Sequence, residues 1–145
     1  MLYISHRGNL TGINKEFENK PSYIFSALDK NFNVEVDIWF KKNEFYLGHD
    51  YAEDLVNLDF IKTKNIWFHA KNIEAFHELL KLKAICFWHQ NDDVTLTSNG
   101  FIWTYPGKDL TENSICVLPE LYKIKNFNCA GICSDYILDY YNEQN

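Results

Sequence analysis

Two acidic residues lie two positions apart in the segment NVEVDIWF, residues 33–40. Its alternating, β-branched pattern predicts a strand, on which residues two apart point to the same face. Glu35 and Asp37 would then project two carboxylates into one space, where they repel each other unless a cation lies between them. A hard divalent ion with oxygen ligands, Mg²⁺ or Ca²⁺, suits that arrangement. An exposed acidic face on an edge strand is the other interpretation.

A predicted hairpin returns a histidine to this acidic pair. The residues KKN, 41–43, interrupt the strand, and EFYLGHD, 44–50, resumes the period of two. With a three-residue loop, residue 40 faces 44 and residue 35 faces 49. We therefore expect His49 beside Glu35 on the same face, where a general acid or base would act. A slip of one residue in this register would turn His49 away.

Two further candidates share one face of the predicted strand NIWFHAK, residues 65–71. His69 and Lys71 are two positions apart, and a buried lysine is rare unless it is paired. Lys71 is thus a partner of the carboxylates, an anion clamp or a solvated lysine at a strand end. His89 lies in the predicted strand AICFWHQ, and it fits a hydrogen-bonded core histidine as well as a site residue.

Seven short apolar runs and two helical segments must position these residues. The runs are residues 2–6, 33–40, 65–71, 84–90, 100–107, 114–121 and 130–137, and the helices fall within residues 15–31 and 72–83. Consecutive apolar residues, as in AICF, are typical of parallel strands covered on both faces. The pattern predicts one α/β domain over residues 1–145, either a parallel barrel or an open sheet. A full (β/α)₈ barrel usually needs ~250 residues, so any barrel here must have several helices replaced by loops.

Composition narrows the classes of function. The chain has 145 residues, 46% of them hydrophobic, and a formal net charge of −6, which argues against a nucleic-acid surface. It shows no transmembrane run, secretory signal or nucleotide-binding glycine loop. The four cysteines lack the spacing of metal-binding pairs, and we expect reduced core thiols in a cytoplasmic protein.

Four motifs, taken in order along the chain, resemble those of the glycerophosphodiester phosphodiesterase family, one of the phosphatidylinositol-phospholipase-C-like barrels. The first strand ends in His6-Arg7-Gly8, like the family's H-R-G. Glu18-Asn19 is similar to the family's E-N-T, with Lys20 in place of the threonine. Glu35-Val36-Asp37 resembles its E-x-D, and His49-Asp50 its H-D. Further along, WFHAK looks like the strand that ends in E-x-K, and FIWTYPG and GICSDY are similar to W-T-V-N and G-I-x-T-D-Y.

The resemblance implies an abbreviated TIM-type barrel with its site at the carboxyl ends of the strands. It also implies a metal-dependent phosphodiesterase acting on a small glycerol- or polyol-phosphate diester. His6 and His49 would be the acid–base pair, and Arg7 and Lys71 would bind the phosphate. Glu35 and Asp37 would be metal ligands, and the residue at position 69 would be the third ligand.

Position 69 departs from the family, because a histidine stands where the third metal acid is usual. An imidazole is a poorer ligand for Mg²⁺ or Ca²⁺ than a carboxylate. Three outcomes follow: a weaker or different metal such as Mn²⁺ with His69 as ligand, substitution by Glu18 or Glu120, or lost activity. The alternative function is therefore a catalytically silent barrel that binds phosphorylated ligands or a protein partner. Strands without covering helices further predict either a homo-oligomer or aromatic loops folded over the bare face.

Overall fold

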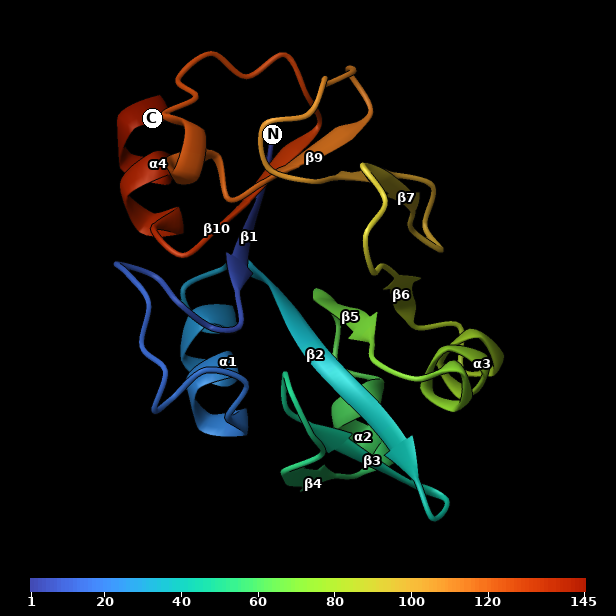
Figure 1. The fold of residues 1–145 in the computed structure, drawn as a ribbon. Coiled ribbons are helices and arrows are strands. Elements are labelled where there is room, and N and C mark those ends of the chain that lie inside the picture. Colours follow the sequence, from blue (N-terminus) through green and yellow to red (C-terminus); the bar gives the residue numbers. More distant parts are fainter.

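The computed structural model describes residues 1–145 as a mixed α/β fold with one ten-stranded sheet and few helices (Figure 1). The strands are β1 Leu2–His6, β2 Asn33–Lys41, β3 Glu44–Leu47, β4 Asp54–Val56, β5 Ile66–Ala70, β6 Ile85–Trp88, β7 Val94–Leu96, β8 Ile102–Thr104, β9 Ser114–Val117 and β10 Gly131–Ser134. The helices are α1 Pro21–Leu28, α2 Leu58–Ile61, α3 Ile73–Lys81 and α4 Ile137–Gln144, with a 3₁₀ turn, η1, at Pro119–Tyr122.

Seven strands run parallel in the order β6-β5-β2-β1-β10-β9-β8. Each overlaps one of the seven predicted apolar runs, so the expectation of parallel strands is confirmed. Three short strands add antiparallel pairs: β3 on β2, β4 on β3, and β7 on β8. The carboxyl ends of the seven parallel strands therefore meet at one edge of the sheet, which is where ligands bind in such folds.

The sheet curls around an inner core, which consists of Ile4, Trp67, Phe87, Trp103, Ile115, Val117 and Cys133. Phe87 of β6 stacks on Trp103 of β8 with ring centroids 4.4 Å apart, although these strands stand at opposite ends of the parallel order. After β7, the amide of Ser98 donates to the carbonyl of Cys86 at 2.8 Å. No ladder pairs β6 with β7 or β8, so the sheet is not closed. Closure into a TIM-type barrel stays a prediction.

The larger, outer core lies between the sheet and helices α1, α2 and α3. Ile24, Phe60 and Leu79, one from each helix, are buried against the strand residues of β2 and β5. Pro21 occupies the start of α1, where its missing N–H costs nothing. Asn72 caps α3 by accepting from the amide of Ala75, and it also bonds to both backbone groups of Phe40 in β2. The predicted helices within residues 15–31 and 72–83 are confirmed in shorter form.

The predicted register of the β2–β3 hairpin is wrong by one residue. Phe40 pairs with Phe45 and Lys41 with Glu44, so the loop contains Lys42 and Asn43 alone. Both loop residues have positive φ, at 52° and 63°, as a two-residue turn of type I′ requires. A lysine rarely adopts positive φ, so Lys42 gives little sequence signal for a two-residue turn. The sequence therefore predicts the longer, three-residue loop. Residue 49 would then face away from Glu35 if β3 continued, but β3 ends at Leu47.

The last quarter of the chain differs most from the predicted elements. Strand β9 stops at Val117 because Leu118 adopts left-handed backbone at φ 46°, and η1 follows. Helix α4 replaces the end of the last predicted run and packs with Phe127 and Tyr140 around Ile132 on the outer face of β10. A helix and aromatic side chains thus cover this strand, while the oligomeric state stays a prediction. None of the helices has the length and apolar character to cross a membrane.

Candidate active site at the carboxyl ends of the parallel strands

A cavity of about 440 Å³ opens at the carboxyl ends of the parallel strands. Most of the residues that the sequence analysis singled out line it: His6, Arg7, Glu35, His49, His69 and Lys71. His6 ends β1, Glu35 lies within β2, and His69 lies in β5. The parallel order places these three strands side by side, and the shared edge brings their side chains together.

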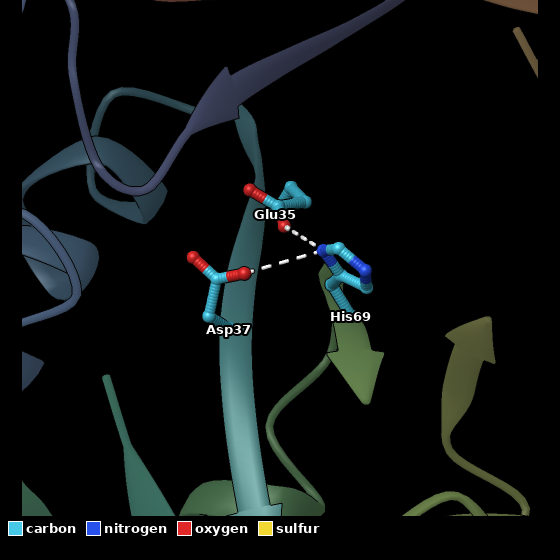
Figure 2. A group of neighbouring side chains, drawn as sticks. All are labelled: Glu35, Asp37 and His69. Carbon is cyan, nitrogen blue, oxygen red and sulfur yellow. Dashed lines mark ion pairs between the residues drawn. The ribbon is translucent and has the colours of Figure 1, made fainter. Parts of the chain in front are cut away.

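Glu35 and Asp37 of β2 and His69 of β5 point toward one another (Figure 2). The Nδ1 atom of His69 lies 3.2 Å from Oδ1 of Asp37 and 3.7 Å from Oε1 of Glu35. One ligand atom from each residue falls within 4.8 Å of the others. Ligands that share an ion at about 2.1 Å lie about 3 Å apart when they subtend a right angle. The spacing is close to that of a metal site.

The hydrogen bonding of His69 leaves one ring nitrogen for a cation. Its Nε2 lies 3.0 Å from the carbonyl oxygen of His89, which can only accept, so Nε2 carries a proton. Nδ1 then faces two carboxylates with either a lone pair or a second proton. A backbone carbonyl on the far nitrogen is the usual support of a metal-bound histidine. Oε2 of Glu35 and Oδ1 of Asp37 are buried without hydrogen-bond partners, so the donor set fits a divalent ion.

Asp37 is a carboxylate surrounded by cations. Its Oδ2 lies 2.9 Å from Nε of Arg7 and accepts from Nδ2 of Asn19, and its Oδ1 lies 3.4 Å from Nζ of Lys71. Burial raises the pKa of such a group, but His69, Arg7 and Lys71 outweigh it and hold the pKa of Asp37 well below its usual range. Asp37 is therefore ionised, and Lys71 has the carboxylate partner that the sequence analysis offered as one interpretation.

Glu35 behaves in the opposite way. Burial and the charge of Asp37 raise the pKa of Glu35 above its ordinary value. Its Oε2 lies 3.8 Å from Nε2 of His6. Glu35 and Asp37 repel each other in one buried space, and their pKa values move in opposite directions. A cation between the two carboxylates would compensate this repulsion.

His6 is oriented by a residue to which the sequence analysis gave no role. Its Nδ1 lies 2.7 Å from Oδ1 of Asp135, which directly follows β10. The carboxylate can only accept, so Nδ1 carries the proton and Nε2 faces the site. Burial lowers the pKa of His6, but the bond to Asp135 and the nearby charge of Glu35 raise it more. Asp135 stands in the quoted segment GICSDY, and that motif was the one signal that could have found it.

Arg7 and Glu18 belong to a supporting network beside the group of Glu35, Asp37 and His69. Arg7 adopts left-handed backbone at φ 55°, a conformation that non-glycine residues hold only when their surroundings fix it. Its Nη1 lies 3.4 Å from Oε2 of Glu18. Asn9 donates to both Glu18 and Asp135 and so links the two carboxylates. Glu18 thus contacts Arg7 rather than joining the group of Glu35, Asp37 and His69.

His49 lines the cavity even though its predicted register is wrong. The backbone turns at Gly48, which has φ 140°, so residue 49 leaves the direction of β3 and reaches the same side as Glu35. Nδ1 of His49 lies 2.8 Å from Oδ1 of Asp50, and its side chain is 44% exposed. His49 therefore presents a partly exposed imidazole at the rim of the cavity, in contrast to the buried His6.

The two remaining candidates are an acid, Glu120, and a histidine, His89. Glu120 accepts from Oγ of Ser134 and from the amide of Asp135, so it braces the loop after β10 and lies outside the group of Glu35, Asp37 and His69. His89 lines the cavity and is only 5% exposed, with both ring nitrogens buried and unpartnered. Burial, then the nearby His69, lower the pKa of His89 to about 4.

Comparison with protein families, curated proteins and solved structures finds no match to this chain.

Proposed function

We propose that this chain is a metal-dependent phosphodiesterase that acts on a phosphodiester anion. The observation that carries the proposal is the convergence of Glu35, Asp37 and His69 with the cations Arg7 and Lys71 and with two histidines at one cavity. Such a site has a place for an ion, positive groups for nonbridging oxygens, and two groups that transfer protons.

Glu35, Asp37 and His69 would hold the ion, which would supply Lewis-acid stabilisation of charge on the phosphoryl oxygens. The remaining positive charge comes from the chain itself. Arg7 can contact nonbridging oxygens through its planar fork, whereas Lys71 acts as a point charge. Both side chains are only 18% exposed, so little water screens them.

The two histidines suit an in-line displacement at phosphorus. The oxygen of water or of a neighbouring substrate hydroxyl forms a bond to phosphorus while the bond to the leaving alkoxide breaks. One histidine takes the proton of the nucleophile, and the other gives a proton to the alkoxide, so the charges balance. His6 and His49 each have Nδ1 against a carboxylate, Asp135 and Asp50, which leaves Nε2 for this transfer. The assignment of acid and base between them stays open.

A second function is favoured by His69 itself. The imidazole replaces one negative charge of a three-acid site, which weakens binding of Mg²⁺ or Ca²⁺. A barrel-like fold that binds phosphorylated ligands without turnover would keep Arg7 and Lys71 but have no need of paired histidines. The retention of both histidine–carboxylate pairs makes the enzyme the better-supported proposal.

A turnover assay separates the two functions. The protein is incubated with bis(p-nitrophenyl) phosphate or a glycerophosphodiester in Mg²⁺, Ca²⁺ or Mn²⁺. We expect turnover that a chelator removes, and we expect Asp37→Asn and His6→Asn each to lower kcat/KM by about 10²-fold or more. His77→Asn makes the same kind of change at an exposed histidine of α3 and should stay within about twofold of the parent. Binding of phosphate without turnover in any of these ions would favour the silent fold.

A further inference from the structure

The cavity has two chemically different halves. Its charged half comes from β1, β2 and β5 and holds His6, Arg7, Glu35, His69 and Lys71. Its other half comes from the carboxyl ends of β6, β8 and β9, where Trp88, Trp103, Tyr105, Val117 and Leu118 line it together with His89 and Gln90. We call the first five of these residues the apolar wall. A ligand held by its phosphate at the charged half would present its organic substituent to the apolar wall.

The apolar wall lies where the two ends of the parallel order approach each other, and side-chain contacts across the gap hold it in place. The rings of His89 and Tyr105 approach to 3.8 Å between centroids, and Phe87 stacks on Trp103 directly beneath. Tyr105 is also tied across the gap, since its hydroxyl donates to the carbonyl of Gln90 at 3.0 Å. A wall fixed by such contacts loses little conformational entropy when a ligand packs against it.

Two polar groups at this wall are already occupied or shielded. The hydroxyl of Tyr105 is used by Gln90, and both nitrogens of His89 are inaccessible to solvent. A substituent rich in hydroxyl groups would lose its hydration there and find few equivalent bonds, at a cost for each group left unpaired. An apolar substituent would instead gain from leaving water.

We propose that the phosphodiester bound at this site carries an alkyl, acyl or aryl substituent that packs on the apolar wall. The inference rests on the proposed function for the phosphodiester group of the substrate. It adds that this substrate is amphiphilic. Leu118 is the most informative residue of the wall, because its left-handed backbone at φ 46° fits asparagine better than leucine. The variant Leu118→Asn therefore makes the wall polar at a position whose backbone tolerates the change.

The test measures binding of phosphate monoesters rather than turnover. Affinities of methyl, butyl, hexyl and phenyl phosphate are measured by calorimetry with the Mn²⁺-loaded protein. We expect each methylene to add about threefold, so that hexyl phosphate, which has five more methylenes, binds about 200-fold tighter than methyl phosphate. Leu118→Asn and Tyr105→Ser should each reduce that ratio to about a third or less. Leu121→Asn, at an exposed leucine of η1 outside the cavity, should leave it unchanged.

The outcomes distinguish the subsite from the enzyme. Equal affinity for methyl and hexyl phosphate, with turnover of diesters intact, would overturn the apolar subsite and leave the proposed function standing. A chain-length preference without turnover of any diester would support the subsite and reject the enzyme. Absence of binding by every phosphate monoester would overturn the apolar subsite, and absence of diester turnover as well would overturn both. Tighter binding of phenyl than of hexyl phosphate would identify an aryl rather than an alkyl substituent.

Discussion

His69 is the register partner of Asp37 on the neighbouring strand, and its Nδ1 atom lies 3.2 Å from Oδ1 of that carboxylate. The opposite ring nitrogen bonds to the carbonyl of His89, so this imidazole is fixed at both ends. The pairing of β5 with β2 therefore decides which side chain completes the group of Glu35 and Asp37. A nitrogen donor at that place favours Mn²⁺ or Zn²⁺ over the harder Mg²⁺ and Ca²⁺.

Replacing this nitrogen donor with an oxygen donor should change the metal preference. In His69→Glu, a third carboxylate would face Glu35 and Asp37, and we expect affinity for Ca²⁺ to rise about tenfold or more relative to that for Zn²⁺. Calorimetric titration with each ion measures the ratio. His77→Glu introduces the same residue on the exposed face of α3 and serves as the control. An unchanged ratio in His69→Glu would mean that residue 69 is not a ligand.

Asp135 should act on catalysis through the orientation of His6. In Asp135→Asn, the amide can present its N–H to Nδ1 of His6, which favours the tautomer with its proton on Nε2. We expect kcat to fall about 10²-fold or more while KM changes less than about threefold, because phosphate contacts are untouched. Asp139→Asn, at an exposed position in the first turn of α4, is the matched control. A loss confined to KM would count against the positioning role.

Gly48 should be required for the stability of the turn that carries His49. Its φ of 140° suits glycine, and a Cβ atom there would lie 2.1 Å from the carbonyl oxygen of Tyr51. Gly100 also has positive φ, at 90°, but a Cβ atom there would meet nothing within 4 Å. We expect Gly48→Ala to lower the free energy of unfolding by at least about 1 kcal/mol more than Gly100→Ala. Urea denaturation measures both, and equal losses would show that the contact with Tyr51 is relieved easily.

His89 should make the folded state sensitive to acid. Its pKa is about 4 in the fold against an ordinary value of 6.5, so between these values the unfolded chain binds a proton that the folded chain does not. Stability should therefore fall as pH drops from about 6.5 toward 4, by at most about 3 kcal/mol at about 1.4 kcal/mol per unit.

The variant His89→Phe isolates this contribution. Phenylalanine keeps a ring against Tyr105 and removes two buried, unpartnered nitrogens. We expect the difference in unfolding free energy between variant and parent to grow in favour of the variant as pH falls from 7 to 4.5. A difference that stays constant across this range would contradict the low pKa of His89.

The sequence determined the strands and the acidic pair. Short apolar runs predict the seven parallel strands, and consecutive apolar residues such as those of AICF are typical of strands covered on both faces. The two-residue period placed Glu35 with Asp37 and His69 with Lys71, because side chains alternate along any strand whatever its neighbours. These are local properties of the backbone, and they held.

Contacts between distant segments select which of these groups come together. The contact of His6 with Asp135 joins residues 129 positions apart through the pairing of β1 with β10. The hairpin register depended on Lys42 and Asn43 adopting positive φ, and the place of His49 depended on the turn at Gly48. The apolar wall arose where β6 and β8 approach each other around the inner core. Strand pairing and side-chain packing set such contacts between distant segments, and a periodic pattern within one segment carries no record of its partner.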